Sequence, residues 1–466
     1  MDRFLRLRIY NAEGTAVEYD NSIDDDWGIV TSSARLDRKI MQSELRFGDY
    51  IANMFQIQVY GLPKNINLKD RKVVLTLNYD YEVRDRIVND AGDYVVNSDG
   101  DYLVGSSSIQ SATEDLFTGY VNSSTMDIVK TDRTILAYDR AYTDRDINIA
   151  TWWNSYWTTH ENDTITLATF RTALLTQFNI PYVSATLLND SAVVTNGLVD
   201  VSYLTLGTVL SAICQLQCCC PNINGSGNLE FVTLATTPYS VAENTEGLSS
   251  TWKDFTTEKI TGIGVYDTSK ELAQVVGTDD NVYNIAGNVF LLGMSAQQIT
   301  TVCTNILNAI KDIQYTPCTL KSIISDVGHK LGDYIVSQEG NAYIMTQSFS
   351  GSLLIEEQID CPATSPILST IVSNINDEII DGQKVAKIRK DIDSLEIDYA
   401  DYKLQVASQF QQTAESITTE VKSLGGYTAP VFDCIAINTV DNMVQLQLEL
   451  IYAEYFSPLT VGSVYS

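Results

Sequence analysis

The residues that most often carry out chemistry are sparse in this chain. His160 and His329 are its only histidines, and neither belongs to a GxSxG nucleophile motif or an HExxH zinc motif. A cysteine hydrolase would need one of the eight cysteines beside one of these histidines, and the sequence offers no support for that pairing. We expect both histidines to be structural or at the surface, and we expect no enzyme.

The cysteines are the next possible ligands and nucleophiles. Half of them cluster at Cys214, Cys218, Cys219 and Cys220. No histidine lies nearby in the sequence, and no second CxxC pair completes a zinc set. The interpretation is that they are small buried residues at the end of a helix, in a chain made in a reducing compartment.

A repeat at 87–105 carries carboxylates beside glycines. It reads NDAGDYVV and then NSDGDYLV, and its acidic residues are Asp90, Asp93, Asp99 and Asp101. Such residues can bind calcium, but the twelve-residue loop with a closing glutamate is missing. We interpret the repeat as turns of stacked hairpins. Calcium binding stays open as the alternative, and no cofactor or metal is predicted.

Two further kinds of chemistry depend on exposure and on the fold. A pair of carboxylates for glycoside hydrolysis is not excluded by sequence, so a cell-wall hydrolase stays an alternative. Trp152, Trp153 and Trp157 lie close together in INIATWWNSYWTTH. Exposed, they would form a stacking platform and favour a host-surface glycan binder. Buried, they would anchor a core, which is the interpretation we prefer because each such side chain buries a large area.

Charge and length restrict the partners. The 466 residues include 30 Lys and Arg against 59 Asp and Glu, a net charge of −29, so a surface that clamps nucleic acid is not expected. No apolar run of about 18 residues occurs, and the start lacks an apolar signal core. We therefore expect no membrane segment, and synthesis in a cytosol without export.

The elements that must position these residues are mostly strands. The first 80 residues alternate in the strand manner, as in Leu5, Leu7 and Ile9, and predict an antiparallel β domain. From Leu116 to Tyr142 we predict three short strands. Helical spacing then predicts a helix over TLATFRTALLTQFNIPY, capped by Thr166 or Thr164 and stopped before Pro181. Further helices are predicted at 206–216 and 295–313.

The stretch from Pro366 to Leu424 predicts one long helix. Apolar residues recur at alternating spacings of three and four, the seam of a heptad coiled coil. The seam residues are Val385, Ile388, Ile392, Leu395, Tyr399, Tyr402 and Val406. A helix of about 50 residues exceeds the usual globular range and needs partners. They are either other copies of the chain or its own globular part.

Several stretches together resemble the tail-tip or baseplate hub proteins of phages. The matching stretches are 41–77 (MQSELRFGDYIANMFQIQVYGLPKNINLKDRKVVLTL), FTGYV at 117–121, ILAYDRAY at 135–142, IATWW at 149–153, GNLEF at 227–231, VYNIAGNVFLLG at 282–293, LGDYIV at 331–336 and SQFQQTAESITTEV at 408–421. Their order and spacing carry the resemblance, which covers nearly all of residues 1–424.

The resemblance implies a virion structural protein at the tail tip, assembled in the bacterial cytoplasm. Family hubs carry two β-barrel domains akin to tail-tube subunits, built from non-contiguous stretches, and three chains form a ring. The seven seam residues would then be the trimer interface. Implied partners are a distal tail or tube-adaptor protein, the tape measure protein, and receptor-binding proteins or fibres. An acidic bore would let DNA pass without specific binding.

The expected fold class is α+β and mainly β. It comprises an N-terminal β-barrel region at 1–142, an α+β insert at 143–250, and a second β/α hub region at 251–362. A trimeric coiled-coil helix follows at 363–424, and a short β tail or cap at 425–466. Longer family members append a hydrolase or a receptor-binding module, and we expect those activities to belong to other polypeptides here.

Overall fold

The largest sheet among the described residues is antiparallel and contains eleven strands. The structure is a computed structural model, and it describes residues 3–23, 26–86, 104–126, 132–197, 201–240, 249–267, 272–322, 328–337, 339–368, 432–440 and 443–450. The strand order is β13-β17-β21-β20-β3-β4-β7-β6-β5-β1-β2, and every neighbouring pair is antiparallel. The chain is therefore mainly β, as predicted.

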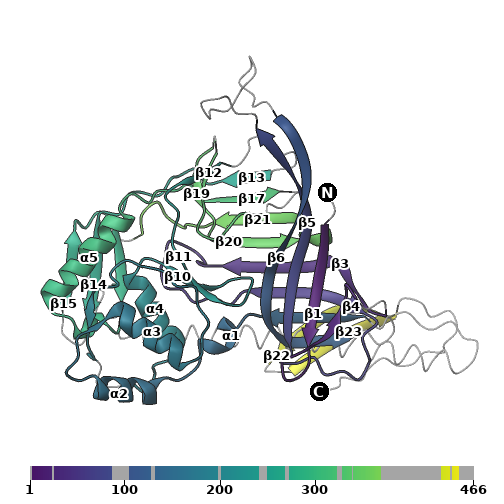
Figure 1. The fold of residues 1–466 in the computed structure, drawn as a ribbon, viewed down its shortest axis with the longest axis horizontal. Coiled ribbons are helices and arrows are strands. Elements are labelled where there is room, and N and C mark those ends of the chain that lie inside the picture. The colour runs from purple at the N-terminus through teal and green to yellow at the C-terminus, as the bar shows by residue number, and fades with distance from the viewer. Residues whose placement is uncertain are drawn as a thin grey trace, which may run out of the picture. The chain divides into compact units, whose positions relative to one another are not determined.

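The sheet joins two distant parts of the chain. One part supplies β1 (Arg3–Tyr10), β2 (Val17–Asp20), β3 (Gly28–Lys39), β4 (Met54–Tyr60), β5 (Lys72–Arg86), β6 (Val104–Met126) and β7 (Arg133–Tyr138). The other supplies β13 (Ser249–Trp252), β17 (Cys318–Ser322), β20 (Thr346–Ser350) and β21 (Glu356–Cys361). They meet where β20 pairs with β3, with Phe349 opposite Leu36. Figure 1 shows the green β20 beside the purple β3.

Alternating apolar residues explain why these strands form. Leu5, Leu7 and Ile9 of β1 are fully buried, and their neighbours in sequence are not. Burial of each such side chain stabilises the fold by about 1.5–3 kcal/mol. Together with residues of β3 to β7 and of β20 they form one of two hydrophobic cores. The antiparallel strands predicted in the first 80 residues are confirmed.

The segment between the two groups, together with segments between strands of the second group, forms an α/β region with the second core. Its helices are α1 (Ala141–Asp144), α2 (Ala150–Thr159), α3 (Leu167–Gln177), α4 (Leu206–Leu216) and α5 (Ala296–Ile310), with the 3-10 turns η1 (Leu291–Gly293) and, beside the sheet, η2 (Ser352–Leu354). Its strands are β8 (Ile165–Thr166), β9 (Val193–Val194), β10 (Cys220–Ile223), β11 (Leu229–Val232), β12 (Pro238–Ser240), β14 (Gly262–Asp267), β15 (Leu272–Gly277), β16 (Val282–Ala286), β18 (Tyr334–Val336) and β19 (Asn341–Tyr343). They form small separate sheets.

Local signals fix the helix starts. The Thr166 side chain accepts a hydrogen bond from the backbone of Thr169 and caps α3, as predicted. Ser295 and Gln298 form a reciprocal capping box at the start of α5. The α4 helix spans the predicted residues, whereas α5 ends at Ile310, three residues earlier than expected.

One strand prediction is wrong. The sequence predicts three strands from Leu116 to Tyr142, but the described residues of this range, 116–126 and 132–142, hold two, β6 and β7, followed by the helical turn α1. The reason is the length of β6, which begins at Val104 and runs through the predicted first strand to Met126. Pairing with β5 on one stretch and with β7 on the next keeps it continuous. The first half of β6 is mostly polar, so its sequence lacks the apolar alternation that predicts a strand.

The chain divides into two units, Met1–Lys384 and Val385–Ser466. In the second, the structure describes one antiparallel hairpin, β22 (Phe432–Val440) with β23 (Met443–Leu450), which confirms the predicted β character of the tail. The seven seam residues lie outside the described residues, as do residues 87–103 of the repeat at 87–105. Within the described part, no helix has both the length and the apolar character that crossing a membrane requires.

Candidate functional site

The last described residues of the first unit lie in a socket. This exit segment, residues 362–368, overlaps the start of the stretch predicted to form the long helix. That part of the prediction is wrong, because residues 363–368 are extended or bent rather than helical. The socket is lined by Glu44, Leu45, Thr257, Glu258, Ile260, Asn281, Ile313 and Tyr315, and by residues 363–368 themselves. Only about 10 Å³ of space is left, roughly one water. The exit segment therefore forms part of the wall, and the space that remains is too small for a ligand larger than a water.

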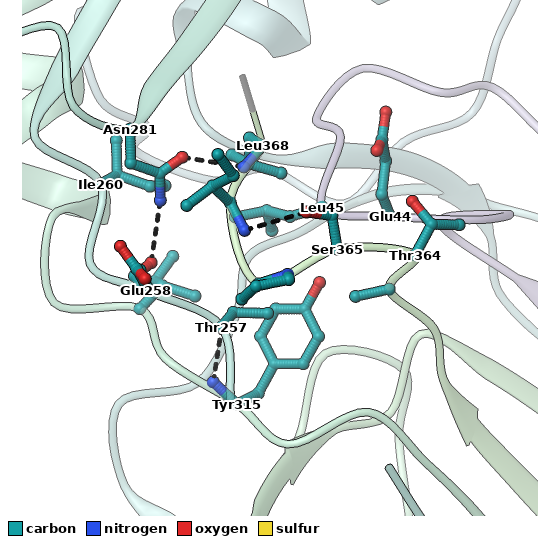
Figure 2. A pocket seen from close by; sticks show the side chains of 14 residues that line it. Glu44, Leu45, Thr257, Glu258, Ile260, Asn281, Tyr315, Thr364, Ser365 and Leu368 are labelled. Atoms are coloured by element: carbon teal, nitrogen blue, oxygen red, sulfur yellow. Dashed lines mark hydrogen bonds between the residues drawn. The ribbon is translucent and has the colours of Figure 1, made fainter. Parts of the chain in front are cut away.

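Asn281 is the central polar residue of the socket. Its side chain is 1% exposed and donates hydrogen bonds to the carbonyl oxygens of Glu258 at 3.0 Å and Lys259 at 3.2 Å. Its Oδ1 accepts the backbone N–H of Leu368 at 2.8 Å. Figure 2 shows the Asn281 side chain between Leu368 and Glu258. Both ends of this buried amide are thus satisfied, which fixes the path of the exit segment.

Two further contacts hold the exit segment upstream of Leu368. The hydroxyl of the buried Tyr315 donates to the carbonyl oxygen of Pro362 at 3.2 Å. The backbone N–H of Glu258 donates to the carbonyl oxygen of Pro366 at 2.7 Å. The loop that contacts Pro366 is itself tied to Tyr315, since Thr257 and Tyr315 exchange hydrogen bonds of 2.8 and 2.9 Å. The exit segment is therefore attached at several points.

A buried polar junction connects the sheet to the α/β region. Asp139 follows β7 and accepts the backbone N–H groups of Asn53 and Ala141, each at 2.9 Å. Asn53 donates to the side chain of Asn222 at 3.0 Å and to the carbonyl oxygen of Ile223 at 2.9 Å. Burial raises the pKa of Asp139 from 3.8 to about 7, although its hydrogen bonds lower it. The junction orients the two cores.

A polar groove lies over five strands of the sheet, and its volume is about 770 Å³. It is lined by residues of β3, β13, β17, β20 and β21. Asp360 on β21 accepts hydrogen bonds from Thr319 at 2.6 Å and from Thr346 at 3.1 Å. Arg35 pairs with Asp37 at 2.9 Å. Asp360 is thus a hydrogen-bond acceptor shared by side chains from two other strands of the groove.

The histidines have structural surroundings. His160 stacks on Tyr156 with ring centroids 4.3 Å apart, and its Nδ1 lies 2.8 Å from the Tyr156 carbonyl oxygen. His329 is buried, and its Nδ1 lies 3.1 Å from a carboxylate oxygen of Glu357. Gln347 donates to the other oxygen of that carboxylate at 2.8 Å. In these contacts the histidine rings face a main-chain carbonyl oxygen and a carboxylate rather than a serine or cysteine side chain.

The tryptophan cluster lies on α2 and packs into the core. Trp153 is fully buried and Trp157 is 8% exposed, while Trp152 is partly buried against the same core. The ring centroid of Phe170 lies 5.4 Å from that of Trp153 and 5.5 Å from that of Trp157. A ligand would have to displace these contacts before stacking on Trp153 or Trp157, so the arrangement matches the core interpretation.

The clustered cysteines are buried, as predicted. Cys214 belongs to α4, and Cys218 to Cys220 follow its end. Burial raises the pKa of the Cys218, Cys219 and Cys220 thiols well above the usual 9.0, so they are poor nucleophiles at neutral pH. Among the described residues, no group of three or more His, Cys, Asp or Glu side chains is arranged to hold a metal ion.

Sequence reasoning did not find the socket or the junction. Asn281, Tyr315 and Asp139 occur in segments that indicate only strands and turns, and no local motif distinguishes them from other polar residues. Their partners lie far away in the chain. The resemblance stretch VYNIAGNVFLLG begins directly after Asn281, which is the nearest signal.

Comparison with known proteins gives distant structural similarity only. No family model matches the chain, and no curated protein matches it. The 43 kDa tail protein of prophage MuSo2 from Shewanella oneidensis has a TM-score of 0.42 and 10% identity, covering 77% of this chain and 97% of its own. The tail protein from Neisseria meningitidis MC58 has a TM-score of 0.41 and 11% identity, covering 78% of this chain and 96% of its own. Prophage tail protein gp18 from Listeria monocytogenes EGD-e has a TM-score of 0.39 and 12% identity, covering 81% of this chain and 98% of its own.

Proposed function

We propose that this protein is a structural component of a phage tail, and specifically a trimeric hub at the tail tip. In this role it closes the tail tube and holds fibres or receptor-binding proteins during host attachment and DNA ejection. Its neighbours are a tube-adaptor protein and the tape measure protein. It acts by assembly rather than by catalysis.

One observation supports this proposal most directly. The eleven-stranded sheet is assembled from seven strands within residues 3–138 and four strands within residues 249–361. Elements of the α/β region separate the two groups in sequence and also lie between strands of the second group. The resemblance of the sequence to hub proteins implies β domains built from non-contiguous stretches in this manner. Barrel closure, in the sense of tail-tube domains, is part of the proposal.

The socket gives the proposed hub a way to connect its parts. The exit segment is attached to the α/β region through Asn281, Tyr315 and Glu258. If residues 385–406 form a three-stranded coiled coil, each chain enters it from such an attachment. Three copies of the first unit would then be held around one axis. The net charge of −29 fits a bore that repels passing DNA.

The mass of the full chain in solution tests the trimer. We expect analytical ultracentrifugation to give three times the chain mass, with a strong helical signal by circular dichroism. A species that stays monomeric at high concentration and lacks that helical signal would contradict the trimer. Tail location is tested separately by imaging particles with an antibody against residues 425–466. Labelling of the tail tip is expected, and labelling of the capsid would contradict the assignment.

A further inference from the structure

Two free cysteines face each other across neighbouring strands of the sheet. Cys318 of β17 is the register partner of Cys361 of β21. Cys318 is 7% exposed and Cys361 is fully buried. Side chains that lie opposite each other in an antiparallel pair point to the same face. The two thiols therefore share one face of the sheet, and both residues also line the polar groove, together with Thr319 and Asp360.

The backbone geometry of this pair suits a covalent bond. Directly opposed residues in antiparallel strands have Cα atoms about 4.5 or 5.5 Å apart, depending on the hydrogen-bonding pattern. Disulfides join residues whose Cα atoms are about 4.4–6.8 Å apart. Both values for opposed residues lie inside that range, so no strand has to move. Among the described strand pairs, Cys318 and Cys361 are the only cysteines in register with each other.

Burial makes both thiols slow to react at neutral pH, as it does for the cysteines near the end of α4. Burial raises the pKa of the Cys318 thiol to about 12 and that of Cys361 well above its usual range. The Cys361 sulfur accepts the backbone N–H of Tyr343 at 3.3 Å. On the other side, Cys318 pairs with Trp252 of β13, a four-residue strand at the end of the sheet.

We propose that Cys318 and Cys361 form an oxidation site that becomes a cross-strand disulfide outside the host cell. The oxidant is a peroxide. The thiolate of Cys318 attacks one peroxide oxygen, which forms a sulfenic acid and releases water after proton transfer. The Cys361 thiolate then attacks that sulfur and a second water leaves. Two thiols and one hydrogen peroxide thus give one disulfide and two waters.

The position of the pair gives the disulfide a structural role. Cys361 is the last residue of β21, and the exit segment begins at the next residue, Pro362. The bond would fasten the point where the chain leaves the sheet to a second strand, β17. A load on the C-terminal part of the chain would then pass to both strands. The proposal that the disulfide forms outside the host cell rests on the proposed function, in which a particle is released from a reducing cytosol. The chemistry of the cysteine pair does not depend on that function.

Peptide mapping of the purified full chain tests the site. The protein is treated with hydrogen peroxide, remaining thiols are blocked under denaturing conditions, and the digest is analysed without reduction. We expect a linked pair of peptides containing Cys318 and Cys361, a mass lower by two hydrogen atoms, and a higher thermal midpoint than in the reduced protein. Formation should be faster at higher pH, because more thiolate is present.

Matched variants decide the assignment. Cys318→Ala and Cys361→Ala should each abolish the linked peptides and the increase in midpoint, and Cys303→Ala should retain both. If a single variant does not fold, the linked peptides from the unaltered protein remain decisive. Absence of the 318–361 link, or preferential linkage among Cys214, Cys218, Cys219 and Cys220, would overturn the proposal. Because the assay uses the purified chain, its result is independent of whether the protein is found in a tail.

Discussion

The side-chain oxygen of Asn281 accepts a hydrogen bond from the backbone N–H of Leu368 at 2.8 Å, across 87 residues of sequence. Asn281 lies just before β16, in the α/β region, and Leu368 is the last described residue of the exit segment. Removal of a buried amide that bonds two separate segments lowers the free energy of unfolding, because the polar groups of both segments are left unpaired. This bond therefore holds the end of the exit segment against the α/β region.

Replacing Asn281 should loosen the exit segment. Asn281→Ala removes the side-chain bonds to Glu258, Lys259 and Leu368, and we expect a loss of about 2–4 kcal/mol in the free energy of unfolding. Limited proteolysis should cut faster near residues 362–384. Asn308→Ala is the matched control, because Asn308 is exposed on α5. Equal proteolysis rates for the two variants would show that Asn281 does not hold the segment.

Asp139 should make stability depend on pH in a specific direction. Its folded-state pKa is raised from 3.8 to about 7 by burial, so its contribution is complete below about pH 4 and is lost as pH rises through 7. The stability advantage of the unaltered protein over Asp139→Asn should fall by about 1.4 kcal/mol per pH unit between pH 4 and 7. Urea unfolding of both proteins at several pH values measures this difference in the free energy of unfolding. A difference that is constant or rises with pH would contradict the assignment.

Trp153 should matter for folding rather than for ligand binding. Its side chain is fully buried, and its Nε1 donates to Asn196 at 3.2 Å. Trp153→Ala should lower the free energy of unfolding by about 3–5 kcal/mol, measured by denaturant unfolding. Tyr182→Ala, at a residue 37% exposed, should cost about 1 kcal/mol or less. A folded, equally stable Trp153→Ala protein that lost binding to bacterial glycans would instead favour the stacking role.

The predicted helical seam should control assembly. Replacing Ile392 and Leu395 together with Asp places charges in the apolar seam and should dissociate the trimer, while the first unit stays folded by circular dichroism. Ser394→Asp with Ile397→Asp adds as many charges at positions outside the seam and should leave the trimer intact. Ultracentrifugation compares the two. If the seam variant stays trimeric, the β domains rather than this helix organise the assembly.

Local structure was determined largely by the sequence itself. Alternation predicted β1, and helical spacing with capping residues predicted α3, α4 and α5 close to their observed bounds, because these signals act within a few residues. The burial of the cysteines near the end of α4 followed from the absence of metal partners. The length of β6 was missed, since a polar strand is stabilised by its neighbours rather than by its own apolar pattern.

Only the tertiary structure decided which distant residues meet. The pairing of β20 with β3, the bond from Asn281 to Leu368 and the register of Cys318 with Cys361 all join segments whose sequences show only strands or loops. Alternation tells which side of a strand is apolar, but not which strand lies beside it or in what register. Those choices depend on how the whole sheet and both cores pack together, and the polar contacts follow from that packing.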